Sequence, residues 1–464
     1  MSKQYDLVVI GSGPGGYVAA ARAASLGLST AIVEKDKALG GTCLHRGCIP
    51  TKALLHAADT YDEIKHASLI GIKTSGVSID WSEIQKYKNK VVGTNAFGVA
   101  HLMKTNKIDV FSGFGSLVDK NTVSVDGPKK EVLKTKNILL AVGSKPKNLP
   151  CCGDKPDKKI LTSDTILDLD HIPSSLTIVG GGVIGIEFAS IFVRFGTKVS
   201  VIEYMPNILS MADEDCIKEL KFQLEKQGVV FYTSASVDKL DAKTKEVKTV
   251  FTQDNKKMEI SSEYVLVSIG RTPLTSAMGL ENTKVVLDKG FVKINQCMQT
   301  DESNIYAIGD CVNTPWLAHV ASKEGLIAAN HMAGKKTNIL NYDHTPSCVY
   351  SEPPVAWSGL TENEAKARGL DIKVSKFDFI RNGKAAILGK TRGFVKFICD
   401  KKYGEILGVH IIGPQATELL AEPAFAMQMQ ATIDDIADVV HAHPTLYEAI
   451  YEAALGATDQ AIHG

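Results

Sequence analysis

Two cysteines in a short, glycine-flanked segment are the residues whose types and spacing most clearly indicate chemistry. Cys43 and Cys48 are separated by four residues within the segment 40–52. One helical turn with a kink could bring their sulfur atoms to bonding distance. Pro50 lies at the start of a predicted helix that runs through Lys52, so both thiols should flank a helix N-terminus, where the dipole favours a thiolate. We expect a redox pair and no metal, because a metal site needs two more soft ligands and the sequence has no second close pair.

The remaining cysteines carry no comparable signal. Nine cysteines, scattered over 464 residues, are too few for a secreted disulfide framework. Cys151 and Cys152 are adjacent and cannot easily pair with each other. The others stand alone and are expected to be buried, inert thiols, namely Cys216, Cys297, Cys311, Cys348 and Cys399.

A second candidate for chemistry is a histidine-containing segment near the C-terminus. His443 could act as a base, and Glu448 could orient it and stabilise its charge. A structural interpretation also exists, because Thr445 and Glu448 have the spacing of a capping box at a helix start. Residue chemistry alone does not choose between His441 and His443 as the base.

A strand–loop–helix–strand unit with a glycine-rich loop occurs twice. In each copy an apolar strand leads into the loop, and the second strand ends in an acidic residue 18 positions after the third glycine. The first copy comprises strand 5–10, Gly11, Gly13 and Gly16, helix 17–26, strand 29–33 and Glu34, and the second comprises strand 175–179, Gly180, Gly182 and Gly185, helix 186–195, strand 198–202 and Glu203.

The physical requirements of dinucleotide binding explain this pattern. The first glycine permits a tight turn, the second lets a pyrophosphate approach the backbone, and the third lets helix and strand pack closely. The helix N-terminus offers free N–H groups to the phosphates, and the acidic residue can accept hydrogen bonds from a ribose diol. One copy would be weak support, but two matching copies strongly predict two dinucleotide sites.

The rest of the chain provides the elements that must position these residues. We expect an α/β fold with two Rossmann-like units and a C-terminal α+β domain, in which strands 372–379, 393–400 and 406–412 precede helical periodicity from residue 417 onward. The predicted domains are 1–148, 149–273, a segment 274–346 that returns to the first domain, and 347–464.

Composition limits the classes of function. Lys plus Arg and Asp plus Glu both number 52, so no net charge attracts nucleic acid or an anionic membrane. No apolar stretch reaches the roughly 18 residues that span a bilayer. A strand-like run begins at Tyr5 and leaves no room for a signal peptide, so a cytoplasmic protein is expected.

Residues 43–52, the two nucleotide motifs in this order and Gly309-Asp310 together resemble the pyridine nucleotide–disulfide oxidoreductases over essentially the whole chain. The resemblance implies FAD in the first unit and a pyridine nucleotide in the second. The flavin ring would lie between the nicotinamide and a Cys43–Cys48 disulfide, with Lys52 paired to Glu187 and Trp316 among the residues that cover the ring. The implied FAD residues are Gly11, Gly13, Gly16, Glu34, Lys52, Gly115, Ala141, Gly143, Ser144, Asp310, Leu317, Ala318 and His319, and the implied NAD residues are Gly180, Gly182, Gly185, Glu187, Glu203, Val237 and Gly270.

The C-terminal segment resembles the His-Pro-Thr-x-x-Glu signature of the lipoamide-linked and glutathione-linked members, whose base corresponds to His443. Glu203 would bond a free 2′-hydroxyl and repel a 2′-phosphate, and no basic residue follows it, so NAD is expected rather than NADP. Val183 stands where the glutathione-linked members carry a gating tyrosine. The residues at 45, 46, 142 and 447 depart from those that the family often has, beside its motif positions.

What the resemblance implies is an enzyme that oxidises protein-bound dihydrolipoyl groups, with Cys43 as the interchange thiol and Cys48 against the flavin. It implies a homodimer that lends His443 to the neighbouring disulfide. The implied partners are the lipoyl domains and acyltransferase core of 2-oxo acid dehydrogenase complexes, or the lipoyl carrier protein of glycine cleavage. Two alternatives are an NADPH-dependent disulfide reductase of the glutathione reductase type and a flavoprotein without catalytic activity.

Overall fold

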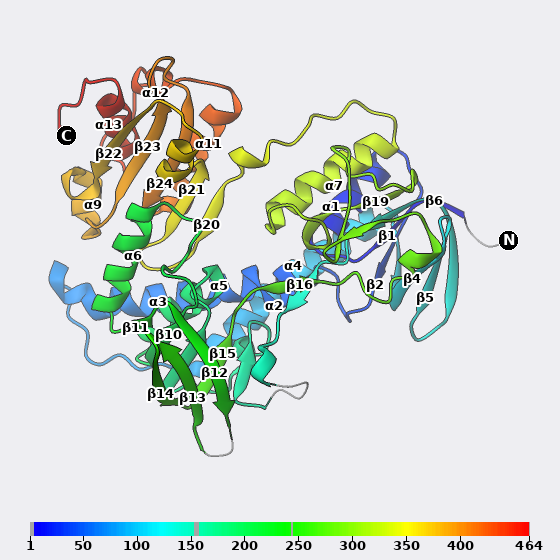
Figure 1. Ribbon diagram of the computed structural model, residues 1–464, viewed down its shortest axis with the longest axis horizontal. Coiled ribbons are helices and arrows are strands. Elements are labelled where there is room, and N and C mark those ends of the chain that lie inside the picture. Colours follow the sequence, from blue (N-terminus) through cyan, green and yellow to red (C-terminus); the bar gives the residue numbers. More distant parts are fainter. Residues whose placement is uncertain (1–3, 153–156, 243–244, 464) are drawn as a thin grey trace.

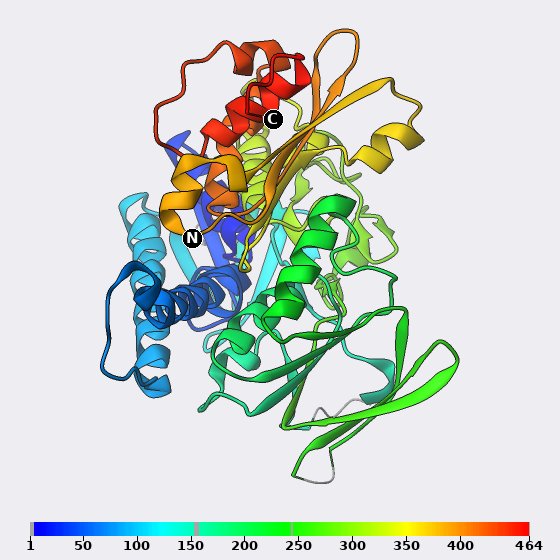
Figure 2. The same ribbon diagram turned by 90° about the vertical axis from the view of Figure 1, so that its left-hand side faces the viewer.

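The computed structural model describes residues 4–152, 157–242 and 245–463. Three main sheets, each with its own helices, make up the molecule (Figure 1). The C-terminal part, orange to red, lies above the two nucleotide-binding units when the molecule is turned (Figure 2). The predicted mixed α/β architecture is confirmed.

The first sheet contains the first glycine-rich unit. Strands β1 and β2 are almost entirely buried, because helices cover one face of the parallel strands and further strands and loops of the same unit cover the other. Helix α1 (Pro14–Ser25) packs against α7 (Ala318–Met332), which comes from much later in the chain. The strand order is β3 (Asp109–Ser112), β2 (Thr30–Glu34), β1 (Gln4–Ile10), β6 (Glu131–Leu140), β5 (Thr122–Asp126) and β4 (Phe114–Asp119), and β19 (Ile305–Ala307) also pairs with β6.

The second sheet repeats this plan with five parallel strands. Its central helix α5 (Val183–Arg194) is apolar on nearly all sides and mostly buried, as a helix between layers must be. A three-stranded antiparallel sheet of β12 (Ala235–Asp241), β13 (Val247–Gln253) and β14 (Lys256–Ser262) lies beside it. The order of the parallel strands is β11 (Val230–Tyr232), β10 (Lys198–Ile202), β9 (Ser175–Val179), β15 (Tyr264–Val267) and β8 (Ile160–Thr162).

The chain crosses between the two units twice, side by side. Strand β7 (Ser144–Pro146) follows the first unit and pairs antiparallel with β16 (Arg271–Pro273), which leads back from the second unit. Because both crossings share one ladder, the Arg271 side chain is held close to Ser144.

The C-terminal sheet is antiparallel throughout. Its strands are β20 (Ser347–Val349), β21 (Val355–Gly359), β24 (Ile406–Ile412), β23 (Phe394–Asp400) and β22 (Ile372–Asp378), in that order. Helix α13 (Glu448–Ala457) packs on β22 and β23, while α6 (Glu214–Lys226) from the second unit packs on β24.

Two sequence-based expectations about helices need correction. The region from residue 417 onward is not continuously helical, because residues 438–447 lie outside helices and His443-Pro444 cannot continue one. Helices α1 and α5 begin three residues earlier than predicted, at Pro14 and Val183, so part of each glycine motif lies in the first helical turn. A proline at the first helical position suits this start, because its missing N–H is unpaired there in any case.

The redox pair lies on a separate group of helices. Helix α2 (Gly41–Arg46) is followed by α3 (Cys48–His66), which packs against α4 (Trp81–Thr105) on one side and against α5 on another. Figure 1 shows α3 and α5 between the second sheet and the C-terminal sheet. Within the part of the chain that the structure describes, no helix is both long and apolar enough to cross a membrane.

Candidate active site

The two cysteines lie at the junction of two helices. Cys48 is the first residue of α3 with Gly47 as its N-cap, whereas Cys43 lies within α2. The expectation that both flank one helix N-terminus is therefore correct only for Cys48. Both side chains are partly buried, and Cys43 contacts Cys48 closely enough to hydrogen-bond with it.

The surroundings make the two thiols unequal. The hydrogen bond from Cys43 and the positive charge of Lys52 lower the pKa of Cys48 to about 7, against burial and the charge of Glu187, which raise it. The pKa of Cys43 is raised, because its proton is shared with Cys48 and because it is buried. Cys48 is therefore the thiolate of the pair and Cys43 the proton donor.

Lys52 and Glu187 form an ion pair beside the thiols, as the resemblance implied. Lys52 lies one helical turn after Cys48 on α3, which places both on one face of that helix. Its Nζ lies 2.9 Å and 2.8 Å from the two carboxylate oxygens of Glu187 on α5. The side chain of Glu187 is only 6% exposed and that of Lys52 is 32% exposed, so the pair links the two units with its carboxylate buried and its ammonium partly open to water.

The glycines of the first nucleotide loop have the backbone geometry that their spacing predicted. Gly11 has a φ of +101°, and an added Cβ would lie 2.3 Å from the Ala141 carbonyl oxygen. A Cβ on Gly16 would lie 2.0 Å from the carbonyl oxygen of Gly11, so helix and strand meet there. A Cβ on Gly13 would meet nothing within 4 Å. That open space lies at the N-terminus of α1, where a pyrophosphate would need it.

The second loop has the same geometry. Gly180 has a φ of +108° and would clash with the Ser268 carbonyl oxygen at 2.5 Å, and Gly185 would clash with Gly180 at 2.0 Å. Gly182 again faces open space at the start of α5. Both loops therefore present a cradle that fits a dinucleotide pyrophosphate.

The acidic residues are also held in matching ways. The backbone N–H of Ser12 donates to Glu34 Oε2 at 2.9 Å, and that of Gly181 donates to Glu203 Oε2 at 2.5 Å. In each copy the residue two positions after the glutamate donates to its Oε1, at 2.9 Å from Asp36 and 2.7 Å from Met205. Each carboxylate is thereby fixed beside its loop while further lone pairs remain for a ribose diol.

Three polar side chains from distant parts of the sequence, Ser144, Arg271 and Asp310, form a cluster. Ser144 Oγ donates to Asp310 Oδ2 at 2.5 Å, and Arg271 Nε donates to Ser144 Oγ at 2.7 Å. The other implied flavin residues lie on strand β4, at the end of β6 and at the start of α7, and His319 Nε2 contacts the Pro346 carbonyl oxygen at 2.8 Å. Of the implied NAD residues outside the loop, Val237 lies on β12, and Gly270 has a φ of +110° with open space for a Cβ.

The structure distinguishes the two C-terminal histidines. His443 Nδ1 lies 2.9 Å from Glu448 Oε1, and its side chain is 78% exposed. His441 is buried instead, with its two ring nitrogens at 2.9 Å from the Val439 carbonyl oxygen and 2.8 Å from Glu422. Only His443 presents a free ring nitrogen, since no described residue contacts its Nε2.

Glu448 contacts both residues that its spacing suggested. Its Oε2 accepts the Thr445 backbone N–H at 2.8 Å, and its Oε1 lies 2.9 Å from His443 Nδ1. The capping box itself is not formed, because α13 begins at Glu448 with Tyr447 as its N-cap and without a side-chain capping bond. Burial acts to raise the pKa of Glu448, but the Thr445 N–H and His443 outweigh it and lower that pKa. A carboxylate that stays ionised can stabilise an imidazolium.

The dyad and the thiols lie in different parts of one chain. Figure 1 shows α13, which begins at Glu448, on the C-terminal part and well away from α2. Among the described residues, no histidine is hydrogen-bonded to either thiol, and the exposed His443 is bonded only through its Nδ1.

Three residues that contact the site were not predicted from the sequence. Ser12 lies between the first two motif glycines, so its contact with Glu34 could have been inferred from its position. Arg271 follows Gly270 but contacts Ser144 and Asp310 only through the strand crossing. Tyr350 lies 4.5 Å from Lys52 Nζ by its ring centroid, a contact between segments 298 positions apart in the sequence.

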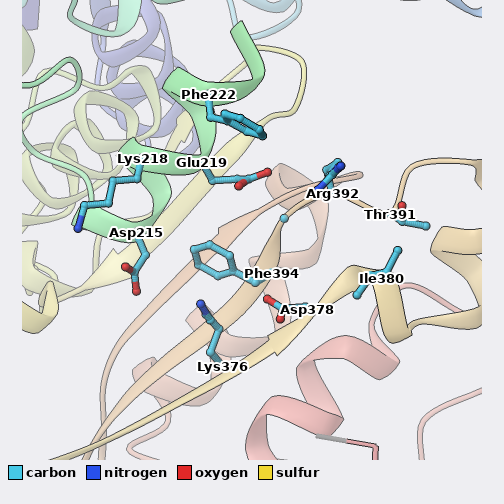
Figure 3. Close-up of a pocket in the computed structure, with 11 residues that line it drawn as sticks. Asp215, Lys218, Glu219, Phe222, Lys376, Asp378, Ile380, Thr391, Arg392 and Phe394 are labelled. Atoms are coloured by element: carbon cyan, nitrogen blue, oxygen red, sulfur yellow. The ribbon is translucent and has the colours of Figure 1, made fainter. Parts of the chain in front are cut away.

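Other predicted features lie outside the site. Cys216, Cys311 and Cys399 are buried as expected, whereas Cys297, which lies in a turn, and Cys348, in the middle of β20, are only partly buried. Within the described ranges, no three His, Cys, Asp or Glu side chains gather as a metal site. A cavity of about 540 Å³ opens between α6 and the C-terminal sheet (Figure 3), but no predicted site residue lines it; the lining residues are Asp215, Lys218, Glu219, Phe222, Lys376, Asp378, Ile380, Thr391, Arg392, Gly393 and Phe394.

Comparisons with known proteins agree with this geometry. The family model for pyridine nucleotide-disulphide oxidoreductases matches residues 5–325, and the model for their dimerisation domain matches residues 345–454. The chain is 46% identical over 476 positions to a dihydrolipoyl dehydrogenase of Bacillus subtilis, with both chains covered in full. It is 42% identical to a mitochondrial dihydrolipoyl dehydrogenase of Pisum sativum, covering all of this chain and 93% of the relative. A crystal structure of LpdA from Mycobacterium tuberculosis has a TM-score of 0.90 at 26% identity and covers 97% of this chain and 98% of its own.

Proposed function

Because the chain belongs to the pyridine nucleotide-disulphide oxidoreductase family, we propose that it is a dihydrolipoamide dehydrogenase that reduces NAD. The observation that carries this proposal is full-length identity of 40–46% to relatives named dihydrolipoyl dehydrogenase. The redox dithiol, the Lys52–Glu187 pair and the His443–Glu448 dyad are the groups that such a reaction needs.

Two dinucleotides complete the proposed site. Family membership implies FAD and a nicotinamide dinucleotide, and the two loops offer cradles that fit them. When bound, FAD supplies the two-electron acceptor and NAD the final hydride acceptor. Glu203 supports NAD, because its carboxylate is held at the end of β10 and no basic side chain follows it to bind a 2′-phosphate.

The chain's own residues carry the proton and thiol steps. His443 Nε2 takes the proton from a dihydrolipoyl thiol, and Glu448 stabilises the imidazolium through Nδ1. The substrate thiolate attacks Cys43 Sγ in the oxidised disulfide, forms a mixed disulfide and releases Cys48 as a thiolate. The second substrate thiol displaces Cys43, which leaves as a thiol, and cyclic lipoamide is released.

The positions of the two thiols support these different roles. Cys48 has the lower pKa and lies beside Lys52, so it is the better leaving group and the stable thiolate. Cys43 has the raised pKa and takes up a proton when it leaves.

The match to the dimerisation domain supports a homodimer, in which we propose that His443 acts on the neighbouring chain's Cys43. The proposed partners are lipoyl groups carried by 2-oxo acid dehydrogenase complexes or by glycine cleavage. The predicted cytoplasmic location and the domain boundaries remain predictions.

A direct assay tests the proposal. Purified, FAD-loaded protein should form NADH from NAD when dihydrolipoamide is added, and Cys43→Ser should abolish this activity. The same protein should prefer NAD to NADP strongly. Rapid NADPH-dependent reduction of glutathione disulfide without dihydrolipoamide turnover would instead support a reductase of the glutathione type.

A further inference from the structure

Tyr350 touches both members of the ion pair beside the redox thiols. Its ring centroid lies 4.5 Å from Lys52 Nζ, and its backbone N–H donates to Glu187 Oε1 at 3.1 Å. We infer that Tyr350 is a positioning residue that holds the Lys52 ammonium beside the Cys48 sulfur. This inference deepens the proposed function and rests on it, because it assigns a role in the same redox centre.

The geometry gives Lys52 two different restraints. Glu187 binds the ammonium through both carboxylate oxygens at 2.9 Å and 2.8 Å, and the Tyr350 ring offers its negative face from another side. The Lys52 side chain is 32% exposed, so water could compete for it if the ring were absent. With the ring in place, the ammonium is restrained by the carboxylate and the ring together.

The strand before Tyr350 fixes the ring. Val349, the last residue of β20, is fully buried in the core, and Tyr350 follows it directly. The Tyr350 hydroxyl hydrogen-bonds with the Cys348 thiol. Burial raises the pKa of Tyr350 to about 12, so this hydroxyl remains neutral and adds no negative charge near the thiols.

Four groups on four segments act on Cys48. Cys43 from α2 donates a hydrogen bond, Lys52 on α3 favours the thiolate, Glu187 on α5 opposes it, and the Tyr350 hydroxyl after β20 stays uncharged. Lys52 is the only cation among these four groups, and its side chain is 32% exposed. Its position therefore controls how readily Cys48 ionises, and removal of the ring should make ionisation harder.

The experiment measures ionisation of Cys48 without using catalytic turnover. Full-length, FAD-loaded protein is reduced, and the alkylation rate of Cys48 by iodoacetamide is followed by peptide mass against pH. The variants are Tyr350→Leu, which removes the ring, and Tyr350→Phe, which keeps the ring and removes only the hydroxyl. We expect Tyr350→Leu to raise the midpoint by about half a pH unit or more, and Tyr350→Phe to leave it nearly unchanged.

A double substitution tests whether the effect passes through Lys52. Lys52→Met should raise the midpoint further than Tyr350→Leu, and adding Tyr350→Leu to Lys52→Met should then change nothing. The inference would be overturned if Tyr350→Leu shifted the alkylation midpoint equally with Lys52 present and with Lys52→Met. It would also be overturned if Tyr350→Leu lowered the melting temperature but kept the wild-type midpoint. If the leucine variant does not fold, Tyr350→Met replaces it, because an unbranched side chain adapts to irregular space.

The outcome is separable from failure of the proposed function. The alkylation midpoint is measurable whether or not the protein oxidises dihydrolipoamide. A protein that shows the expected midpoint shifts but forms no NADH from dihydrolipoamide would retain the role of Tyr350 and lose the assigned substrate.

Discussion

At the scale of single residues, the difference between Cys43 and Cys48 is an electrostatic one. Both are thiols of one junction, yet only Cys48 begins a long helix and lies one turn from Lys52. A pKa of about 7 leaves about half of Cys48 ionised at neutral pH, compared with about one part in a hundred at the ordinary value of 9.0.

This asymmetry predicts a pH dependence. In the two-electron-reduced holoenzyme, the long-wavelength absorbance from a thiolate against flavin should be strong above pH 7 and fade as the pH falls through about 7, because a lowered pKa keeps Cys48 ionised to that point. Cys48→Ser should remove the band at every pH while FAD stays bound. Persistence of the band in Cys48→Ser would assign the thiolate to another residue.

The nucleotide preference is a second prediction at this scale. Glu203→Arg should raise KM for NAD and improve use of NADP, because a guanidinium can bind a 2′-phosphate in bidentate fashion. Glu203→Gln is the control, since it removes charge without supplying a cation and should weaken NAD use without helping NADP. Unchanged NAD kinetics in both variants would mean that Glu203 does not face the ribose.

The two C-terminal histidines form a matched pair for a third prediction. His443→Ala should lower turnover with dihydrolipoamide by about 10²–10⁴-fold and leave the melting temperature nearly unchanged, because the side chain is exposed. His441→Ala should instead destabilise the fold by about 1–3 kcal/mol, because it removes a buried ring that packs against Tyr447 and Tyr451 and makes two hydrogen-bonding contacts. The reverse pattern, measured by kinetics and thermal unfolding, would exchange their roles.

At the scale of elements, each nucleotide loop contains one glycine that must pack closely against the backbone and another that borders open space. Gly185 packs against the carbonyl oxygen of Gly180, whereas Gly182 borders open space. The close packing at Gly185 is a requirement of the folded chain alone. The lack of a side chain at Gly182 matters only if a ligand comes close to the loop.

Paired substitutions in one loop test this distinction. Gly182→Ala should leave the melting temperature of the protein without nucleotide unchanged and weaken NAD binding, measured by titration calorimetry or KM. Gly185→Ala should lower that melting temperature, at a cost of about 1–3 kcal/mol, because the Cβ would lie 2.0 Å from a carbonyl oxygen. If Gly182→Ala binds NAD normally, the pyrophosphate does not approach the loop there.

Helix α3 is the element that joins the three parts of the molecule. It begins with Cys48 and carries Lys52, which bonds α5 of the second unit and lies under Tyr350 of the C-terminal part. The redox dithiol thus lies on helices that contact α4 and α5, and Lys52 also contacts the Tyr350 ring, which fixes its groups more firmly than a loop could.

At the scale of the whole molecule, the separation of the thiols from the dyad has a testable consequence. Cys43→Ser and His443→Ala homodimers should each be nearly inactive. After the two variants are unfolded together and refolded with FAD, each mixed dimer should contain one site with both groups intact, so dihydrolipoamide-dependent NADH formation should return. Background activity, with mixed dimers present by native mass spectrometry, would contradict a shared site.

Much of this protein is determined by short-range sequence pattern. The two nucleotide loops, their acidic residues, the thiol pair and the His443–Glu448 spacing are all local, because glycine dihedrals and helix periodicity act over a few residues. For that reason the strands β1, β9 and β10 lie where they were predicted, within a residue.

Only the tertiary structure decided which groups meet across the chain. It buried His441 and exposed His443, although both belong to one segment of similar chemistry. It also brought Arg271 to Ser144 through the β7–β16 ladder, and Tyr350 to Lys52 through the packing of β20 near α5. Such contacts depend on how sheets and helices pack against each other. Local propensities do not determine that packing, because it follows from the burial of apolar surface over the whole molecule.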